Sequence, residues 1–203
     1  MDQEGQWVAQ ALRGDQSAFA HLVDTYKTPI YNLCYRMLGT PTEAEDAAQE
    51  TFVRVYTHLK GYDPQQKLSS WVLAVASHYC VDRLRRRRIN WISLDEEPEW
   101  EPPTADAVYP EDVAVENESS AEIRGWLQSL PPEYRLVITL RYWQDLSYEE
   151  IARATGTSES AIKSRLHRAR AMIAQQVLAQ RKLEAPPSRG ALEGKKVISN
   201  ATL

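Results

Sequence analysis

The stretch LSYEEIARATGTSESAIKSRLHRARAMI, residues 146–173, has the pattern of two short helices joined by a tight turn. Ser147 and Glu150 form a capping box, which predicts the start of the first helix. Gly156 can adopt the positive φ at which a helix ends, and Ser158 can cap the second helix. The stretch therefore predicts a helix-turn-helix unit.

The second predicted helix has an apolar face and a polar face. At helical spacing its core stripe comprises Ile162, Leu166, Ala169 and Ile173. The opposite face carries Ser160, Ser164, His167, Arg168 and Ala171, with Lys163 on its flank. Small polar side chains mixed with long cations suit a helix that enters a major groove. The same pattern also occurs in helical bundles whose charged faces are only solvated, so the pattern alone leaves both interpretations open.

A longer stretch around this unit resembles a known family. LPPEYRLVITLRYWQDLSYEEIARATGTSESAIKSRLHRARAMI, residues 130–173, is similar throughout to the promoter-binding domain of bacterial sigma factors of the extracytoplasmic-function (ECF) subfamily. The resemblance implies that the second helix reads the minus-35 promoter element. Arg165 and Arg170 lie closer to the core stripe, which favours phosphate contacts for them. The candidate minus-35 residues are Ser160, Lys163, Ser164, Arg165, His167, Arg168 and Arg170.

Length and composition limit the class of protein to which the chain can belong. Its 203 residues, 43% hydrophobic and 26% charged, describe a soluble globular chain of one or two domains. No apolar run approaches the roughly 18 residues that cross a bilayer, and the N-terminus lacks a hydrophobic signal region, so we expect a cytoplasmic protein. Cys34 and Cys80 are too few and too far apart in sequence for a metal cluster or a disulfide framework. Cys34 lies on an apolar stripe, which favours a buried thiol.

The net charge of −4 is unevenly distributed. Residues 95–118 contain ten acidic residues and no Lys or Arg, which leaves 18 acidic against 24 basic residues, a balance of +6, in the rest of the chain. The basic residues cluster at 83–88 and 163–170. Outside the acidic segment, the charge is that expected of a protein that contacts phosphates.

Apolar spacing and capping residues predict three further helices between residues 15 and 88. Residues 15–38 repeat apolar positions at helical spacing, with a break or kink expected at Pro29. A capping box beginning at Thr40, with Pro41 at the first helical position, then predicts a second helix. A third run, LSSWVLAVASHYCVDRLRRRR at residues 68–88, is apolar first and cationic at its end.

Trp71 precedes a helix end that is rich in arginine, at residues 83–88. An aromatic side chain can stack on an unpaired base, and neighbouring cations can bind the nucleic-acid backbone. The alternatives are that Trp71 belongs to the core and that the cations complement the helix dipole. The residues by themselves leave these interpretations open.

A second resemblance concerns this N-terminal part. AEDAAQETFVRVY (residues 44–56) and SSWVLAVASHYCVDRLRRR (residues 69–87) are similar to the sigma-family module that docks on the polymerase clamp and melts the promoter. The implied polymerase contacts are Asp46, Gln49, Glu50 and Arg54. The implied minus-ten and melting residues are Leu68, Ser69, Trp71, His78, Arg83, Arg86 and Arg87. Leu68 stands where the family commonly has an aromatic and His78 where it usually has Asn.

We therefore predict an all-α chain of two small helical domains on a flexible acidic linker. The predicted boundaries are 1–88 for sigma region 2, 89–120 for the linker, 121–183 for sigma region 4 and 184–203 for a disordered tail. The linker is acidic and rich in proline, a composition that does not fold alone. By resemblance it threads a polymerase channel normally occupied by nucleic acid; a passive spacer is the alternative.

No catalytic constellation is present in the sequence. The histidines (His21, His58, His78 and His167) are scattered, and neither a phosphate-cradling glycine loop nor a Ser/His/Asp grouping can be argued from spacing. We therefore expect no enzyme activity, catalytic residue, metal or cofactor, and a hydrolase is the weakest interpretation.

The predicted function is that of an alternative sigma factor. Its expected partners are core RNA polymerase through the beta and beta-prime subunits, promoter DNA and, by resemblance, an inhibitory anti-sigma factor, without membrane insertion. The main alternative is a free-standing helix-turn-helix transcription regulator. That alternative predicts a dimerisation or sensor domain before the helix-turn-helix unit and tight operator binding by the protein alone.

Overall fold

The computed structural model describes residues 3–92 and 118–184, and these ranges contain helices and short connections but no strand. The prediction of an all-helical chain is confirmed. None of the described helices is long and apolar enough to cross a membrane. The N-terminal half contains α1 (Gln3–Ala11), α2 (Gln16–Leu38), α3 (Pro41–His58), the 3-10 turn η1 (Leu59–Gly61) and α4 (Leu68–Ile92). The C-terminal half contains α5 (Glu118–Ser129), α6 (Pro132–Tyr142), α7 (Tyr148–Thr155) and α8 (Glu159–Glu184).

Parts of the predicted linker and tail lie outside the described residues, namely 93–117 and 185–203. The two ends of the predicted linker are described, and both are helical. Helix α4 continues to Ile92 and α5 begins at Glu118. The linker that was expected to begin at residue 89 is thus preceded by one more turn of α4.

The predicted helix ends that depend on capping are confirmed, although the capping box at Thr40 is only half formed: the Thr40 side chain accepts the Glu43 N–H, and the Glu43 carboxylate accepts the Thr40 hydroxyl. The Ser147 side chain accepts a hydrogen bond from the Glu150 N–H, and the Glu150 carboxylate accepts one from the Ser147 N–H, so the capping box of α7 is complete. Gly156 ends α7 in the left-handed region with φ 63°. The Ser158 hydroxyl accepts from the Ala161 N–H at 3.2 Å and caps α8.

The expected break at Pro29 is wrong, because α2 is continuous from Gln16 to Leu38. Proline removes one backbone donor from a helix, but the apolar face of α2 is buried on both sides of this position. Tyr26 is 5% exposed and Ile30 is fully buried. Burial of that face opposes the local effect of the proline, and α2 ends instead at Gly39, with φ 94°.

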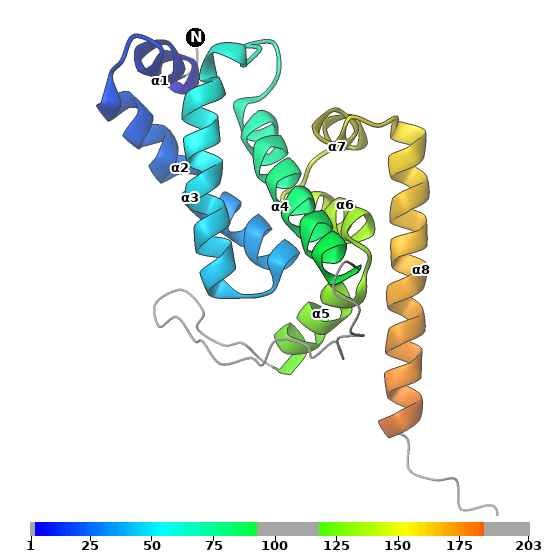
Figure 1. Ribbon diagram of the computed structural model, residues 1–203. Coiled ribbons are helices and arrows are strands. Elements are labelled where there is room, and N and C mark those ends of the chain that lie inside the picture. The colour runs from blue at the N-terminus through cyan, green and yellow to red at the C-terminus, as the bar shows by residue number, and fades with distance from the viewer. Residues whose placement is uncertain (1–2, 93–117, 185–203) are drawn as a thin grey trace, which may run out of the picture.

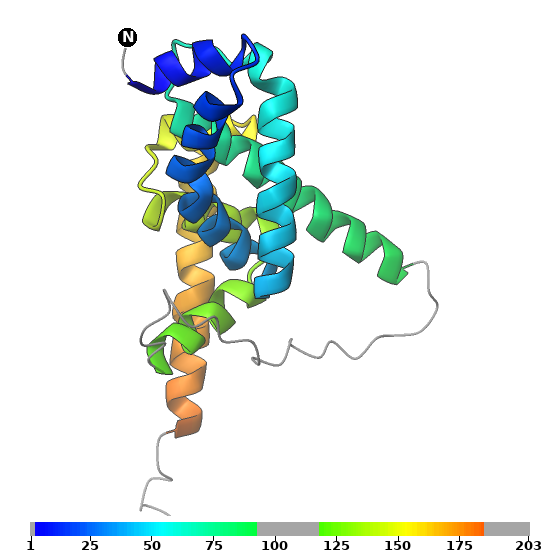
Figure 2. The same ribbon diagram turned by 90° about the vertical axis from the view of Figure 1, so that its left-hand side faces the viewer.

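The two halves of the chain pack against each other. Buried apolar side chains of both halves form one continuous core, in which Ile30 and Leu33 of α2 and Val137 and Leu140 of α6 are fully buried. Helix α2 contacts α5 and α6, and α4 contacts α6 and α7. In Figure 1, α8 stands on the side away from α1–α3, and its C-terminal half extends past the other helices. Figure 2 shows the C-terminal half of α4 projecting from the bundle.

Arg135 of α6 joins the C-terminal half to the end of α2. Its buried guanidinium donates to the backbone carbonyl of Met37 and to the side-chain oxygen of Gln128. A cation at the C-terminal end of a helix is favourable because unpaired carbonyls gather there. Burial lowers the pKa of Arg135 to about 10, so the group stays charged at neutral pH. Gln128 also packs against Gly39, where an added Cβ would lie 3.0 Å from its side chain.

Candidate functional site

The helix-turn-helix unit is formed by α7, the turn at residues 156–158 and α8. Ile151 of α7 and Ile162 of α8 are fully buried, and Leu166 and Ala169 are at most 2% exposed. Ile173, the last residue of the predicted core stripe, is half-buried. The predicted unit and its core stripe are therefore confirmed.

The opposite face of α8 is open to solvent. Lys163 lies 3.8 Å from Glu159 and 5.8 Å from the ring centre of Tyr148. Ion pairs between such exposed groups are weak, which leaves the Lys163 ammonium available to another anion. Arg165 is half-buried beside the core stripe. The exposed members of the predicted minus-35 set are Ser160, Lys163, Ser164, His167, Arg168 and Arg170.

The predicted polymerase contacts lie on α3. Asp46 and Gln49 are exposed, and the half-buried Glu50 and Arg54 are paired with each other at 2.9 Å. The sequence-based prediction missed Val53, which is 57% exposed on the same side of the helix. Val53 follows Asp46 by seven residues and Glu50 by three, a spacing that places the three side chains on one face. An apolar residue within that otherwise polar stripe was the signal that could have revealed it.

Tyr56 is a second exposed apolar residue on α3, with 50% of its surface exposed. Its ring meets the ring of Phe19 edge-on, with 4.9 Å between centroids, so it is held on one side by α2. The exposed surface of α3 thus combines carboxylates with apolar groups. Protein interfaces commonly have this composition at their cores and rims.

The predicted minus-ten residues near the start of α4 differ in exposure. Leu68 is buried, Ser69 and Trp71 are half-buried, and His78 is exposed. The Trp71 ring packs on the ring of Tyr62 with centroids 5.4 Å apart. Trp71 therefore contributes to packing and also retains an accessible surface.

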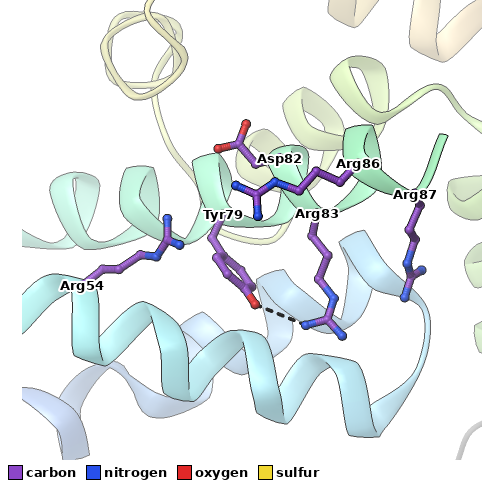
Figure 3. A pocket seen from close by; sticks show the side chains of 6 residues that line it. All are labelled: Arg54, Tyr79, Asp82, Arg83, Arg86 and Arg87. Carbon is purple, nitrogen blue, oxygen red and sulfur yellow. Dashed lines mark hydrogen bonds between the residues drawn. The ribbon is translucent and has the colours of Figure 1, made fainter. Parts of the chain in front are cut away.

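The arginines at the other end of α4 line a cleft of about 290 Å³ with Arg54 of α3. Arg54 lies 4.8 Å above the centre of the Tyr79 ring, and Arg83 donates to the Tyr79 hydroxyl at 3.2 Å. Figure 3 shows Tyr79, Arg83 and Arg87 pointing toward α3, whereas the side chain of Arg86 runs along α4 beside Asp82. The structure thus brings together a predicted polymerase contact, Arg54, and the predicted phosphate contacts of α4.

Arg83 and Arg87 are both paired with a carboxylate of α3. Arg83 lies 3.4 Å from Glu43 and 3.9 Å from Asp46, and Arg87 also pairs with Glu43. Burial lowers the pKa of Arg87 from its usual value. The guanidinium groups of Arg83 and Arg87, which we predicted to bind DNA phosphates, are thus paired with carboxylates of α3 in this structure.

The start of α4 and the helix-turn-helix unit are in direct contact. The Ser70 hydroxyl donates to Glu150 at 3.2 Å, and the Lys67 ammonium lies 2.9 Å from the same carboxylate oxygen. The pKa of Glu150 falls to about 2, mainly because the carboxylate accepts the backbone N–H of Ser147 and also because Lys67 lies beside it. Parts of the chain predicted to contact separate promoter elements therefore touch each other.

The two cysteines, far apart in sequence, are neighbours in the core. Both are fully buried, and their sulfur atoms lie 3.7 Å apart across α2 and α4. The Cys34 thiol and burial together raise the pKa of the Cys80 thiol well above its usual value. Within residues 3–92 and 118–184, no group of three or more His, Cys, Asp or Glu side chains could hold a metal ion.

Comparison with known proteins identifies similar families and structures. The family described as Sigma-70 region 2 matches residues 22–89, and the family described as Sigma-70, region 4 matches residues 120–173. The ECF RNA polymerase sigma factor SigW of Bacillus subtilis (strain 168) is 39% identical over 177 residues, which cover 84% of this chain and 94% of SigW.

Two solved structures have a similar fold. The structure of CnrH in complex with the cytosolic domain of CnrY has a TM-score of 0.64 at 25% identity, covering 88% of this chain and 99% of that one. The sigma factor RpoE of Bartonella quintana, solved with the anti-sigma factor NepR, has a TM-score of 0.65 at 19% identity. That match covers 78% of this chain and 96% of RpoE, and it supports the fold alone.

Proposed function

Because the chain belongs to the ECF RNA polymerase sigma factors, we propose that it binds core RNA polymerase, directs it to specific promoters and helps to melt the DNA. The observation that carries this proposal is the pairing of two parts in one chain. A helix-turn-helix unit exposes a cationic face on α8, and a separate helical module exposes the Asp46 and Gln49 side chains on α3 beside the half-buried Glu50. A free-standing regulator needs only the first part.

We assign the promoter contacts by element. The exposed groups of α8 (Lys163, Ser164, His167 and Arg168) are the candidates for base edges of the minus-35 element. Trp71 and Arg86 of α4 are candidates for the opened minus-ten strand, Trp71 by stacking and Arg86 by phosphate contact. The proposed sigma regions are residues 1–88 and 121–183.

The decisive experiment is a pull-down with core RNA polymerase followed by run-off transcription from a library of promoter fragments. We expect co-purification with the core enzyme and transcripts from a subset of the fragments. Tight binding to DNA by the chain alone, without association with core polymerase, would favour the free-standing regulator instead.

The role of Trp71 in strand opening has its own test. Trp71→Ala should allow closed-complex formation but reduce the permanganate reactivity of the minus-ten thymines, because a stacking platform for an unpaired base is removed. A promoter that is already unpaired at this position should restore transcription. Failure of the unpaired promoter to rescue the variant would assign Trp71 to packing only.

The contact between Ser70 and Glu150 supports the idea that the described arrangement is a resting form. Promoter elements at minus ten and minus 35 are about 25 base pairs apart, or about 85 Å of DNA at a rise of about 3.4 Å per base pair. Helix α8, the longest of the described helices, has 26 residues and spans about 39 Å. The start of α4 and the helix-turn-helix unit, which we assign to the two elements, touch at Ser70 and Glu150, 3.2 Å apart. Elements that touch in this way do not span about 85 Å of DNA, so we propose that the halves separate on promoters.

We also propose a cytoplasmic protein partner that binds the chain when it is not on polymerase. The relative CnrH was solved in complex with the cytosolic domain of CnrY. In this chain an anti-sigma factor would act by covering the exposed face of α3 that we assign to polymerase. Competition between the two partners in a pull-down would test this assignment.

A further inference from the structure

We propose that Glu43 occupies the phosphate position between Arg83 and Arg87 when no nucleic acid is bound, so that its carboxylate competes with the DNA backbone for these two guanidinium groups. The proposal rests on the proposed function, because it concerns the arginines assigned to the minus-ten region. It adds a residue that belongs to neither the polymerase contacts nor the DNA contacts. Glu43 is a positioning residue that sets how strongly the free chain binds a phosphate backbone.

The geometry at Glu43 is that of an anion site. Arg83 and Arg87 are four residues apart and lie on the same face of α4. Both guanidinium groups pair with a single oxygen of the Glu43 carboxylate on the facing helix α3. Arginine binds carboxylate and phosphate oxygens with the same planar donors, so a phosphate oxygen can take the place of this carboxylate oxygen.

The carboxylate is held in this position by the start of α3. One oxygen of Glu43 accepts the hydroxyl of Thr40 at 3.2 Å, and the Glu43 N–H donates to the same Thr40 oxygen at 3.4 Å. The other oxygen is left to face α4. The capping interaction therefore pre-positions the anion at little additional cost in side-chain entropy.

Burial makes the pairs stronger than ordinary surface ion pairs. The Glu43 side chain is 17% exposed, that of Arg83 30% and that of Arg87 41%. Partial exclusion of water strengthens Coulomb attraction, yet both arginines also line the cleft of about 290 Å³ seen in Figure 3. A phosphate can reach the two arginines through this cleft, but it must displace the carboxylate.

The other charges of the cleft do not produce the same competition. Glu50 pairs with Arg54 on its own helix, and Asp82 lies beside the Arg86 side chain. Asp46 reaches Arg83 only at 3.9 Å and is 59% exposed. Among residues 3–92 and 118–184, Glu43 is the carboxylate that pairs with both Arg83 and Arg87.

A purely structural role for Glu43 makes the opposite prediction about DNA. If its ion pairs only fasten α3 to α4, neutralising Glu43 should lower stability and leave DNA affinity unchanged or lower. If Glu43 competes with phosphate, the same change should raise the affinity. The sign of the effect therefore separates the two roles.

The test is the substitution Glu43→Gln in the full chain. Glutamine keeps a side-chain oxygen that can accept the Thr40 hydroxyl, and the Thr40 cap on the residue 43 N–H is unaffected, so the start of α3 is retained while the charge is removed. The measurement is fluorescence anisotropy with a short labelled oligothymidylate over a range of salt concentrations. Each additional phosphate that the chain neutralises on single-stranded DNA steepens the salt slope by about 0.7, which corresponds to about a fivefold increase in affinity near 0.1 M salt.

Glu45→Gln is the matched control. Glu45 lies on the same helix and its substitution changes the net charge equally, but no ion pair between Glu45 and an arginine occurs among the described residues. Glu45 is half-buried, and the control should leave affinity within about twofold of the parent because it pairs with neither Arg83 nor Arg87. An equal increase in both variants, no increase in Glu43→Gln, or no binding by either chain would overturn the proposal.

Two further variants exclude trivial explanations. Glu43→Asp keeps the charge but shortens its reach, so it should give a smaller increase in the same direction. Arg87→Gln should cost more affinity in the Glu43→Gln background than in the parent chain, where Arg87 is already occupied. Additive effects of the two substitutions would contradict the competition.

Two controls apply to every variant. Circular dichroism checks that each variant is folded. Successful pull-down of core polymerase by the parent chain shows that a negative result concerns Glu43 and not the proposed function.

Discussion

Lys67 and Glu150, 83 positions apart in the sequence, form an ion pair of 2.9 Å between the connection before α4 and the first helix of the helix-turn-helix unit. The same Glu150 carboxylate completes the capping box of α7. One side chain therefore both caps the first helix of the helix-turn-helix unit and attaches that helix to the other half of the chain. Opening of the two halves must break the Lys67 contact but can keep the cap.

Lys67→Glu should loosen the closed arrangement. The change replaces attraction to Glu150 with repulsion, and because Lys67 is 74% exposed the original pair contributes only about 0.2–1 kcal/mol. We expect a larger radius of gyration by small-angle X-ray scattering, most clearly at low salt. Lys60→Glu, an equal charge change at an exposed position of η1, is the control and should leave the radius unchanged.

Lowering the pH from 4.5 toward 2 should reduce the free energy of unfolding, because Glu150 becomes protonated. The folded-state pKa of Glu150, about 2, lies below the ordinary value of 4.5, so its contribution to stability is present above pH 4.5 and is lost as pH falls toward 2. Urea unfolding followed by circular dichroism should show this loss. Glu150→Gln keeps the capping geometry and should show a shallower dependence in this window; an unchanged dependence would argue against Glu150 as its source.

Arg168 and Arg165 should behave differently in a promoter library. Arg168 is exposed on the face of α8 that we assign to the major groove, and one good bidentate base contact provides about 1–3 kcal/mol of discrimination, so Arg168→Ala should relax sequence preference at one or two positions. Arg165→Ala should lower transcription from all promoters about equally and reduce the salt dependence. A uniform loss with Arg168→Ala would place that residue among the phosphate contacts.

Val53→Asp should weaken binding to core polymerase without unfolding the chain. Val53 is 57% exposed within the α3 face that carries Asp46 and Glu50, and desolvating a charge in an apolar contact there would cost more than the roughly 1–3 kcal/mol of an unpaired neutral polar group. Leu178→Asp, at a 58% exposed position on α8, is the matched control. Equal loss of affinity in both variants would show that the effect is not specific to the α3 face.

The two cysteines should be unreactive in the folded chain. Both are fully buried, and the pKa of Cys80 is raised by its neighbour Cys34 and by burial, so little thiolate is present at neutral pH. Ellman's reagent should release its coloured product at the rate of unfolding and report both thiols in denaturant. Rapid labelling of the native chain would mean that α2 and α4 separate readily.

The sequence by itself determined the local elements and the family. The caps at Thr40, Ser147 and Ser158 and the end at Gly156 depend on residues within four positions of each other, so a pattern read along the chain identifies them. The core stripe of α8 was likewise predictable from helical spacing. The break that was one of the two outcomes expected at Pro29 does not occur, because the local preference of one residue is opposed by burial of the apolar face of α2.

Only the tertiary structure decided which of these elements meet. The pairing of Glu43 with Arg83 and Arg87, the proximity of Cys34 and Cys80 and the contact of Lys67 with Glu150 join residues that are 40 or more positions apart. Such pairs depend on how helices are rotated and displaced against one another. That arrangement is set by the packing of many apolar side chains together, and no short stretch of sequence contains it.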